Sequence, residues 1–180
     1  MEEQRMAGSV EHLKQYIRDI ADFPQPGVLY RDITPLLANA AAFKEVLDAL
    51  AAQYRETAIE AIVAVESRGF IFGAPLAYIL GVPFVTARKF GKLPYTTINV
   101  AYQLEYGEAI IEMHTDALTP GQRVLIVDDL LATGGTTAAT VELVEKLGAE
   151  VVGVAFVIEL TFLNGRARLG DHDIFALIQY

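Results

Sequence analysis

Residues 123–140 read RVLIVDDLLATGGTTAAT, and this stretch decides the fold. The apolar run from Val124 to Val127 is rich in β-branched residues, which is typical of a strand buried on both faces of a sheet. The carboxylates of Asp128 and Asp129 follow it, and a loop of small residues then leads into a helical pattern that ends at Gly148. A strand, an acidic pair, a glycine loop and a helix in this order predict a phosphate site at the carboxyl end of a strand. Backbone N–H groups of the loop and of the helix start face an anion there.

The glycine spacing separates this loop from the two commonest phosphate loops. The chain contains neither the GxxxxGK[ST] pattern of nucleoside-triphosphate loops nor the GxGxxG pattern of dinucleotide sites. For a Gly-Gly pair alone, an ordinary strand-to-helix turn is the alternative. The two aspartates favour a ligand site, because carboxylates at the end of an apolar strand are costly unless they have partners.

Composition bounds the class of protein. The chain has 180 residues, of which 53% are hydrophobic and 21% charged, so we expect one globular domain with a sizeable core. A formal net charge of -9 disfavours nucleic acid as a partner. No stretch approaches the ~18 apolar residues of a membrane span, and residues 1–15 lack the apolar core of a signal peptide. The absence of cysteine excludes thiol chemistry. We expect a cytoplasmic protein without membrane contact, whose anionic ligands are bound by local basic residues or a metal ion.

Strand and helix patterns alternate along most of the chain. Helices are predicted over residues 9–20, 39–54, 70–80 and 136–147, and strands over 61–65, 82–85, 109–113, 124–127, 151–158 and 174–178. Residues 95–108 fit a flap or a β-hairpin. The helix over 70–80 is apolar all round and is expected to be buried. The alternation favours an α/β fold with an open, mainly parallel, twisted sheet flanked by helices.

Basic residues gather after another predicted strand. Arg88, Lys89 and Lys92 form the densest positive cluster of this acidic chain. A solvated charge run is the alternative to a ligand site. The position favours a ligand site, because open α/β sheets bind ligands at the carboxyl ends of their strands. For Arg31, which adjoins Asp32, a surface ion pair between these two neighbours remains an equal alternative to a ligand role.

Several blocks carry a family resemblance. The stretch VLIVDDLLATGGTT resembles the signature with which type I phosphoribosyltransferases bind phosphoribosyl pyrophosphate (PRPP). Further blocks are similar to the branch of this family that uses adenine: Phe23–Val28, Arg31–Ile33, Ser67–Phe70, Arg88–Pro94 and Leu104–Gly107. The blocks span roughly residues 10–180. The resemblance implies the type I phosphoribosyltransferase fold in a single domain over residues 1–180, with an N-terminal hood at about 1–36 and a flexible flap at about 92–108.

The resemblance also implies a reaction. A purine salvage enzyme of this kind, a pentosyltransferase, joins N9 of adenine to C1′ of PRPP and produces AMP and pyrophosphate. Catalysis is then expected to rest on positioning and on stabilising the charge of the departing pyrophosphate. Mg²⁺ is the implied cofactor, and PRPP rather than protein side chains is expected to ligate most of it. The family further implies a homodimer.

Roles in PRPP binding carry over by position. The loop for the ribose 5-phosphate comprises Ala132, Thr133, Gly134, Gly135 and Thr136. Asp128 and Asp129 match the pair that binds the ribose hydroxyls and supports Mg²⁺ indirectly. Arg68, Arg88 and Lys92 match positions that face the pyrophosphate, where arginine suits bidentate contacts and lysine acts as a point charge.

Roles on the adenine side carry over in the same way. Leu29 and Arg31 match backbone contacts to the base edge, Tyr30 stands where the family has a phenylalanine against the ring, and Leu130 packs on the other face. Glu105 matches the flap carboxylate that handles the proton of purine N7, and Tyr106 its aromatic neighbour. The resemblance thus implies three catalytic residues: Glu105, Arg68 and Lys92.

Ala132 bears on the choice of base. In relatives that use 6-oxopurines the corresponding residue is an aspartate, so alanine disfavours hypoxanthine and guanine as substrates. A phosphoribosyltransferase for another purine, such as xanthine, remains the alternative. A PRPP-binding regulator without catalysis is a second alternative, which the presence of Glu105 and Lys92 disfavours.

Overall fold

The computed structural model describes residues 10–103 and 107–180. The chain divides into two compact units, residues 1–49 and 50–180. The predicted N-cap Ser9 lies outside the described residues, and so do Glu105 and Tyr106.

The first unit contains the short elements η1 (Glu11–Tyr16), β1 (Arg18–Ala21), β2 (Leu29–Asp32) and α2 (Thr34–Leu37) and the start of α3 (Ala40–Tyr54). The prediction of one helix over residues 9–20 is wrong, because η1 is a short 3₁₀-helix and the chain becomes extended at Ile17, with φ -108° and ψ 119°. The apolar spacing reflects burial of Val10 and Leu13, whereas Ile20 is exposed in β1. Asn39 does cap α3, since its Oδ1 accepts a hydrogen bond from the backbone N–H of Ala42 at 3.0 Å.

Strands β1 and β2 form an antiparallel hairpin in which Asp19 lies opposite Arg31. The side chains of Asp19 and Arg31 form an ion pair across the hairpin. Asp32 instead accepts a hydrogen bond from Nη2 of Arg18 at 2.7 Å. Hydrogen bonds from Thr34, together with those from Arg18, lower the pKa of Asp32 to about 2. Both charges of the predicted ion pair therefore have partners across the hairpin.

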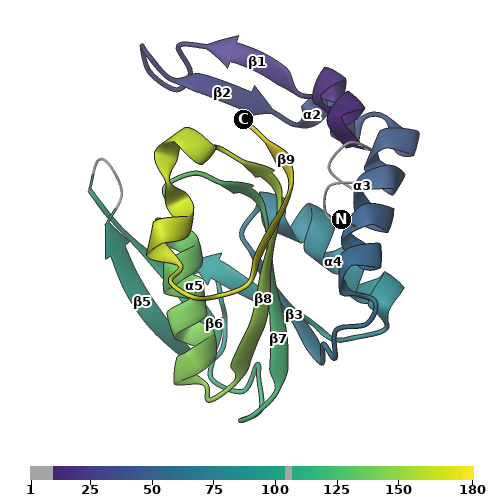
Figure 1. The fold of residues 1–180 in the computed structure, drawn as a ribbon. Helices are drawn as coiled ribbons and strands as arrows, with labels where there is room; N and C mark the ends of the chain where they lie inside the picture. The colour runs from purple at the N-terminus through teal and green to yellow at the C-terminus, as the bar shows by residue number, and fades with distance from the viewer. Residues whose placement is uncertain (1–9, 104–106) are drawn as a thin grey trace. The chain divides into compact units, whose positions relative to one another are not determined.

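The second unit is built on a seven-stranded sheet in the order β5-β6-β4-β3-β7-β8-β9 (Figure 1). The strands are β3 (Ala61–Val65), β4 (Phe84–Lys89), β5 (Thr97–Gln103), β6 (Glu108–His114), β7 (Arg123–Leu131), β8 (Glu150–Glu159) and β9 (Ile174–Gln179). Neighbours from β4 to β9 in this order pair in parallel, and β5 and β6 add an antiparallel edge. The prediction of an open, mainly parallel sheet flanked by helices is confirmed.

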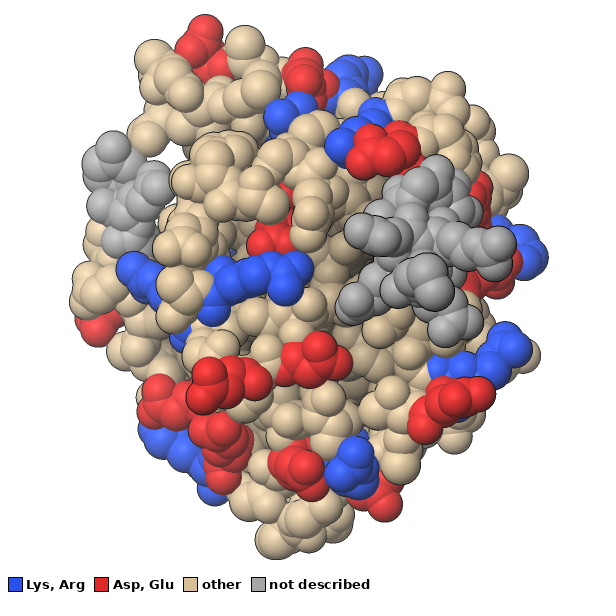
Figure 2. Space-filling view, in the orientation of Figure 1, with Lys and Arg blue, Asp and Glu red and all other residues tan. Residues whose placement is uncertain are grey.

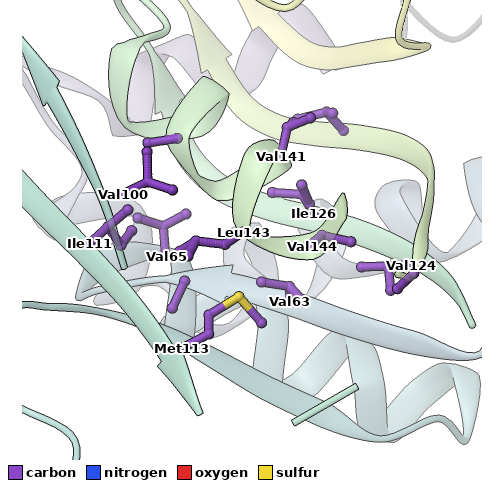
Figure 3. Close-up of a cluster of buried hydrophobic side chains, with 14 of the residues drawn as sticks. Val63, Val65, Val100, Ile111, Met113, Val124, Ile126, Val141, Leu143 and Val144 are labelled. Carbon is purple, nitrogen blue, oxygen red and sulfur yellow. The ribbon is translucent and has the colours of Figure 1, made fainter. Parts of the chain in front are cut away.

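The core of this unit lies between the sheet and α5 (Gly135–Lys146). Figure 3 shows Val63 of β3 and Ile126 of β7 in one cluster with Leu143 and Val144 of α5. The intervening residues of β3 and β7 are also fully buried, as expected for strands covered on both faces. The central strands therefore provide a rigid base for the residues that follow them.

Helix α4 (Arg68–Leu80) packs against β3, β4 and β7 and ends at Gly81, whose φ is +71°. The prediction that this helix is buried on all sides is wrong. Tyr78 is 88% exposed, and Ile71 and Ile79 are also exposed. The helix covers the sheet with one side only, so its apolar residues on the other side face outward. No helix in the two described ranges is long and apolar enough to cross a membrane.

Candidate active site

A cavity of about 750 Å³ lies where β3, β4 and β7 end. Its walls come from these strand ends, the start of α4, the β5–β6 hairpin and the start of α5. Predicted site residues in the lining are Arg68, Asp128, Asp129, Leu130, Ala132 and Thr136. The lining also includes Lys89 of the predicted basic cluster, together with Ser67, Phe90 and Tyr102, to which the sequence assigned no individual role. The carboxyl edge of the sheet is therefore the ligand edge, as the strand order of open α/β sheets requires.

The acidic pair belongs to the last part of β7, which continues through Leu131. Asp129 is 4% exposed, and its Oδ2 lies 2.7 Å from Nε of Arg68. Oδ1 of Asp128 accepts a hydrogen bond from the backbone N–H of Asp129 at 2.8 Å. Residues that the sequence separates widely, Arg68 and Asp129, thus meet in one charged group.

The close approach of α4 to β7 depends on Gly69. A Cβ atom at this position would lie 2.9 Å from the carbonyl oxygen of Val127 and 3.0 Å from Oδ1 of Asp128. Real side chains do not tolerate such contacts with backbone. Glycine next to Arg68 therefore lets the first turn of α4 bring its arginine to the acidic pair.

Burial raises the pKa of both carboxyl groups in the pair. The negative charge of Asp129 raises the pKa of Asp128 further, whereas Arg68 opposes the rise for Asp129. Two carboxylates held in this state gain from hydroxyl donors or a nearby cation. Within residues 10–103 and 107–180, no group of three or more His, Cys, Asp or Glu side chains converges as a metal site.

The glycine loop links β7 to α5, which begins at Gly135. Gly134 has φ +79°, and a Cβ atom there would lie 2.5 Å from the carbonyl oxygen of Gly165. Ala132 and Thr136 line the cavity on either side of Thr133, Gly134 and Gly135. Because the first N–H groups of a helix lack intrahelical partners, the start of α5 offers donors to an anion.

Glu66, which follows β3, binds the basic cluster at the end of β4. Nε and Nη2 of Arg88 donate to the two carboxylate oxygens of Glu66 at 3.2 and 3.1 Å, and the backbone N–H of Lys89 donates to Oε2 at 3.0 Å. The hydrogen bond from Arg88 is the main cause that lowers the pKa of Glu66. Nη1 of Arg88 also donates to the carbonyl oxygen of Lys92 at 3.0 Å. Arg88 is therefore engaged within the protein, and its contact with pyrophosphate stays a prediction.

A buried carboxylate, Glu112 of β6, holds the turn that carries Lys92. Glu112 is 2% exposed, and its Oε1 accepts hydrogen bonds from the backbone N–H groups of Lys92 and Leu93 at 3.1 and 3.2 Å. Its Oε2 accepts from Oγ1 of Thr97 at 3.2 Å. Sequence reasoning missed this residue, although a lone acidic residue inside an apolar strand is a signal that could have found it.

The residues predicted to contact the base belong to both units: Leu29 and Tyr30 to the first, and Leu130 to the second. Leu29 is 45% exposed, and the ring of Tyr30 packs edge-to-face with that of Phe23 at 5.1 Å between centroids. Leu130 lines the cavity of the second unit. The positions of Glu105 and Tyr106, and with them the predicted flap contacts, lie outside the described ranges.

Three comparisons place the chain among known proteins. A family model, the phosphoribosyl transferase domain, matches residues 35–175. The chain is 60% identical over 169 residues to adenine phosphoribosyltransferase of Roseiflexus sp. (strain RS-1), covering 94% of this chain and 98% of that protein.

Two solved structures are similar over nearly the whole chain. Adenine phosphoribosyltransferase from Thermoanaerobacter pseudethanolicus has a TM-score of 0.93 at 51% identity, covering 95% of this chain and 99% of that one. The enzyme from Saccharomyces cerevisiae, complexed with an imino-altritol bisphosphate and adenine, has a TM-score of 0.88 at 40% identity, covering 97% and 99%.

Proposed function

The chain belongs to the phosphoribosyl transferase family, and we propose that it is the purine salvage enzyme that transfers the phosphoribosyl group of PRPP to N9 of adenine, producing AMP and pyrophosphate. The observation that carries the sugar-phosphate half of this proposal is the cavity that joins the acidic pair of β7 to the start of α5. The adenine half is supported by the identity of 60% to an adenine phosphoribosyltransferase over almost the whole chain.

The ribose 5-phosphate binds the loop from Ala132 to Thr136. Backbone N–H groups at the start of α5 and the threonine hydroxyls are the donors. Asp128 and Asp129 accept hydrogen bonds from the ribose 2- and 3-hydroxyls. Their burial supports this role, because each accepted hydrogen bond stabilises an ionised carboxylate that water cannot reach freely.

The pyrophosphate binds the basic side of the cavity. Arg68 stands at the acidic pair, and Lys92 lies on the turn that Glu112 holds. As the C1′–O bond breaks, its electron pair leaves with pyrophosphate and positive charge develops on the ribose. Cations placed beforehand at the leaving group lower the barrier to this step, because they need no rearrangement during the reaction.

Mg²⁺ is the proposed cofactor. Mg²⁺ prefers oxygen ligands and retains several bound water molecules. The site fits this preference, because two carboxylates lie beside the proposed sugar site and PRPP supplies phosphate oxygens. Asp128 and Asp129 would support the ion, and when bound it would neutralise charge on the pyrophosphate.

N9 of adenine forms the new bond to C1′ while a proton leaves the purine. Glu105 is the proposed acceptor of the proton from N7, with Tyr106 beside it on a flap over about residues 92–108. Leu29, Tyr30, Arg31 and Leu130 are the proposed contacts of the base. We also propose an N-terminal hood over about residues 1–36 and a cytoplasmic location. The flap, the base contacts, the hood and the location are all inferred from the sequence.

A homodimer is also part of the proposal. Ile71, Ala74 and Tyr78 are exposed along one side of α4 at helical spacing. Exposed apolar side chains that line up on one helix mark a surface that another chain can cover. A second copy of this chain is the proposed partner.

Base preference tests the proposed activity. The protein is incubated with PRPP, Mg²⁺ and adenine, hypoxanthine, guanine or xanthine, and the nucleotide formed is measured by chromatography. We expect AMP from adenine and little nucleotide from the other bases. Preferential formation of xanthosine monophosphate would favour the alternative enzyme, and binding of PRPP without any nucleotide would favour the regulator.

A further inference from the structure

The segment that follows β8 contacts the phosphate loop. It comprises two short 3₁₀-helices, η2 (Thr161–Leu163) and η3 (Gly165–Arg168), and Figure 1 shows it in yellow-green beside α5. The backbone of Gly165 packs directly on the loop, since a Cβ atom at Gly165 would collide with the carbonyl oxygen of Ala132. A Cβ atom at Gly134 would in turn collide with the carbonyl oxygen of Gly165. The two backbones are therefore fitted to each other at glycine positions.

A buried carboxylate anchors this segment to the sheet. Glu159, at the end of β8, is 4% exposed and accepts hydrogen bonds from Nε and Nη2 of Arg166, both at 2.7 Å. Nε2 of Gln179 donates to the same carboxylate at 3.2 Å, and Nη1 of Arg166 donates to the carbonyl oxygen of Ile174 at 2.9 Å. A bidentate pair with two further contacts holds η3 in one position.

Arg168, at the end of η3, extends from this anchor along the glycine loop. Its Cβ lies 3.4 Å from the position of a Cβ atom on Gly134, and its Nη1 lies 3.5 Å from the corresponding position on Gly135. The side chain of Arg168 makes no hydrogen bond or ion pair with another residue that the structure describes. Figure 2 shows basic side chains gathered over this segment on the face viewed.

The guanidinium of Arg168 is exposed and lies beside the start of α5. The start of α5 carries the positive end of the helix dipole, where a cation is repelled and an anion is attracted. Four other arginines of this unit have carboxylate partners, among them Arg166 with Glu159 and Arg88 with Glu66, whereas Arg55 has none among the described residues. A phosphate dianion bound at the loop would turn the repulsion into attraction and would offer two oxygens to the planar guanidinium.

We propose that Arg168 is a binding residue for the 5-phosphate of the sugar substrate, adding a side-chain cation to the backbone N–H groups of the loop. The proposal rests on the proposed function, because it assigns the sugar phosphate to this loop. It predicts that Arg168 acts on ligands that carry the 5-phosphate and not on pyrophosphate, whose proposed site is formed by Arg68 and Lys92.

The test compares the binding of two ligands to the wild-type protein and to matched variants by calorimetry. We expect Arg168→Ala to weaken ribose 5-phosphate binding about 10- to 100-fold, the usual effect of losing a charge-assisted hydrogen bond. Pyrophosphate binding should change less than about twofold. Arg168→Lys should recover part of the affinity, since it keeps the charge without the planar fork. If Arg168→Ala does not fold, Arg168→Gln keeps the side-chain length without the charge and has the same expected result.

Lys146→Ala is the control, because it removes an exposed charge at the other end of α5, where Lys146 pairs with Glu142. It should bind both ligands as the wild type does. Unchanged ribose 5-phosphate affinity in Arg168→Ala, equal weakening of both ligands, or failure of the wild type to bind ribose 5-phosphate would overturn the proposal. The measurement needs no base, so a protein that binds ribose 5-phosphate through Arg168 but makes no AMP would contradict the proposed function and leave this inference intact.

Discussion

Asp128, a proposed binding residue, is expected to reduce the stability of the folded protein when it is ionised. Its pKa is raised by burial first and by the charge of Asp129 second. A carboxyl group with a raised pKa in the folded state stabilises the fold at pH values below its unfolded pKa, and this contribution is lost as the pH rises. Ionisation of Asp128 therefore destabilises the fold, and we expect a ligand that donates hydrogen bonds to this carboxylate to offset that cost.

Replacing Asp128 by asparagine should separate stability from binding. We expect Asp128→Asn to raise the free energy of unfolding at pH 7 by about 1 kcal/mol, equivalent to about 2–4 °C in Tm, and to lose most PRPP affinity. Urea unfolding from pH 4 to pH 8 measures this difference. The difference should shrink toward pH 4, because the wild-type carboxyl group then becomes protonated. A variant less stable than the wild type at pH 7 would contradict the account.

Glu112 acts on the site through the turn of Lys92. Glu112→Ala leaves two backbone N–H groups without their acceptor, so we expect a loss of about 1–3 kcal/mol in the free energy of unfolding and a higher KM for PRPP. Glu112→Gln keeps one carbonyl oxygen for these donors and should retain most of both properties. Unfolding and initial rates measure the two effects. Equal losses in both variants would indicate that charge, rather than hydrogen bonding to the turn, is what matters.

The site residues that lie close together along the chain were predictable from the sequence. Asp128, Asp129 and the glycine loop follow one strand, so a single stretch predicts their neighbourhood. Glu112 and Arg168 were not predictable in this way. Glu112 lies on β6 and reaches Lys92 just beyond the neighbouring strand β4, and Arg168 reaches Gly135 from a segment beyond β8. Contacts of this kind depend on how the strands pair.

The glycine loop provides a test of how α5 is held in place. In Gly134→Ala, the left-handed backbone costs about 1–2 kcal/mol, and the collision with Gly165 adds to this cost. Gly81→Ala is the matched control, because Gly81 has φ +71° and a Cβ atom added there would meet no other atom within 4 Å. We expect Gly134→Ala to be the less stable variant and the only one of the two that loses ribose 5-phosphate affinity. Equal unfolding free energies would show that the contact with Gly165 contributes nothing.

The predicted bounds of helices and strands were most accurate where the whole element is buried. The strand predicted over residues 61–65 matches β3, which is buried along its whole length. Strands β4 and β7 continue beyond their apolar runs into Lys89 and Leu131, because neighbouring strands supply backbone partners that hydrophobicity does not report. The N-terminal pattern gave a wrong prediction because its helical spacing covers two different elements. A short 3₁₀-helix buries Leu13, and the strand that follows leaves Ile20 exposed.

The order of the strands explains why the site forms, and it could not be read from the sequence. The alternation of strands and helices predicts a parallel sheet, but any of several orders would satisfy it. In the observed order, β7 lies between β3 and β8. The segments that follow β3 and β8 carry Arg68 and Arg166, and the end of β7 carries the acidic pair, so one sheet edge collects groups from distant parts of the chain.

We predict that two chains associate through the exposed apolar side of α4. Tyr78 is 88% exposed on α4, and a carboxylate in its place would have to be desolvated in any apolar interface. We expect the wild-type protein to sediment with twice the mass of one chain and Tyr78→Asp to shift toward a single chain. Gln53→Asp, at an exposed position of α3, is the control and should leave the mass unchanged. A wild-type protein that sediments as one chain at high concentration would contradict the homodimer.

The proposed reaction moves a phosphoribosyl group from pyrophosphate to adenine. Phosphorus NMR of a mixture of protein, PRPP, Mg²⁺ and adenine follows all phosphorus atoms in one time course. We expect PRPP signals to decline while those of AMP and pyrophosphate rise in equal amounts, and we expect no reaction when adenine is omitted. PRPP that persists beside adenine and folded protein, or that is consumed at the same rate without adenine, would contradict it.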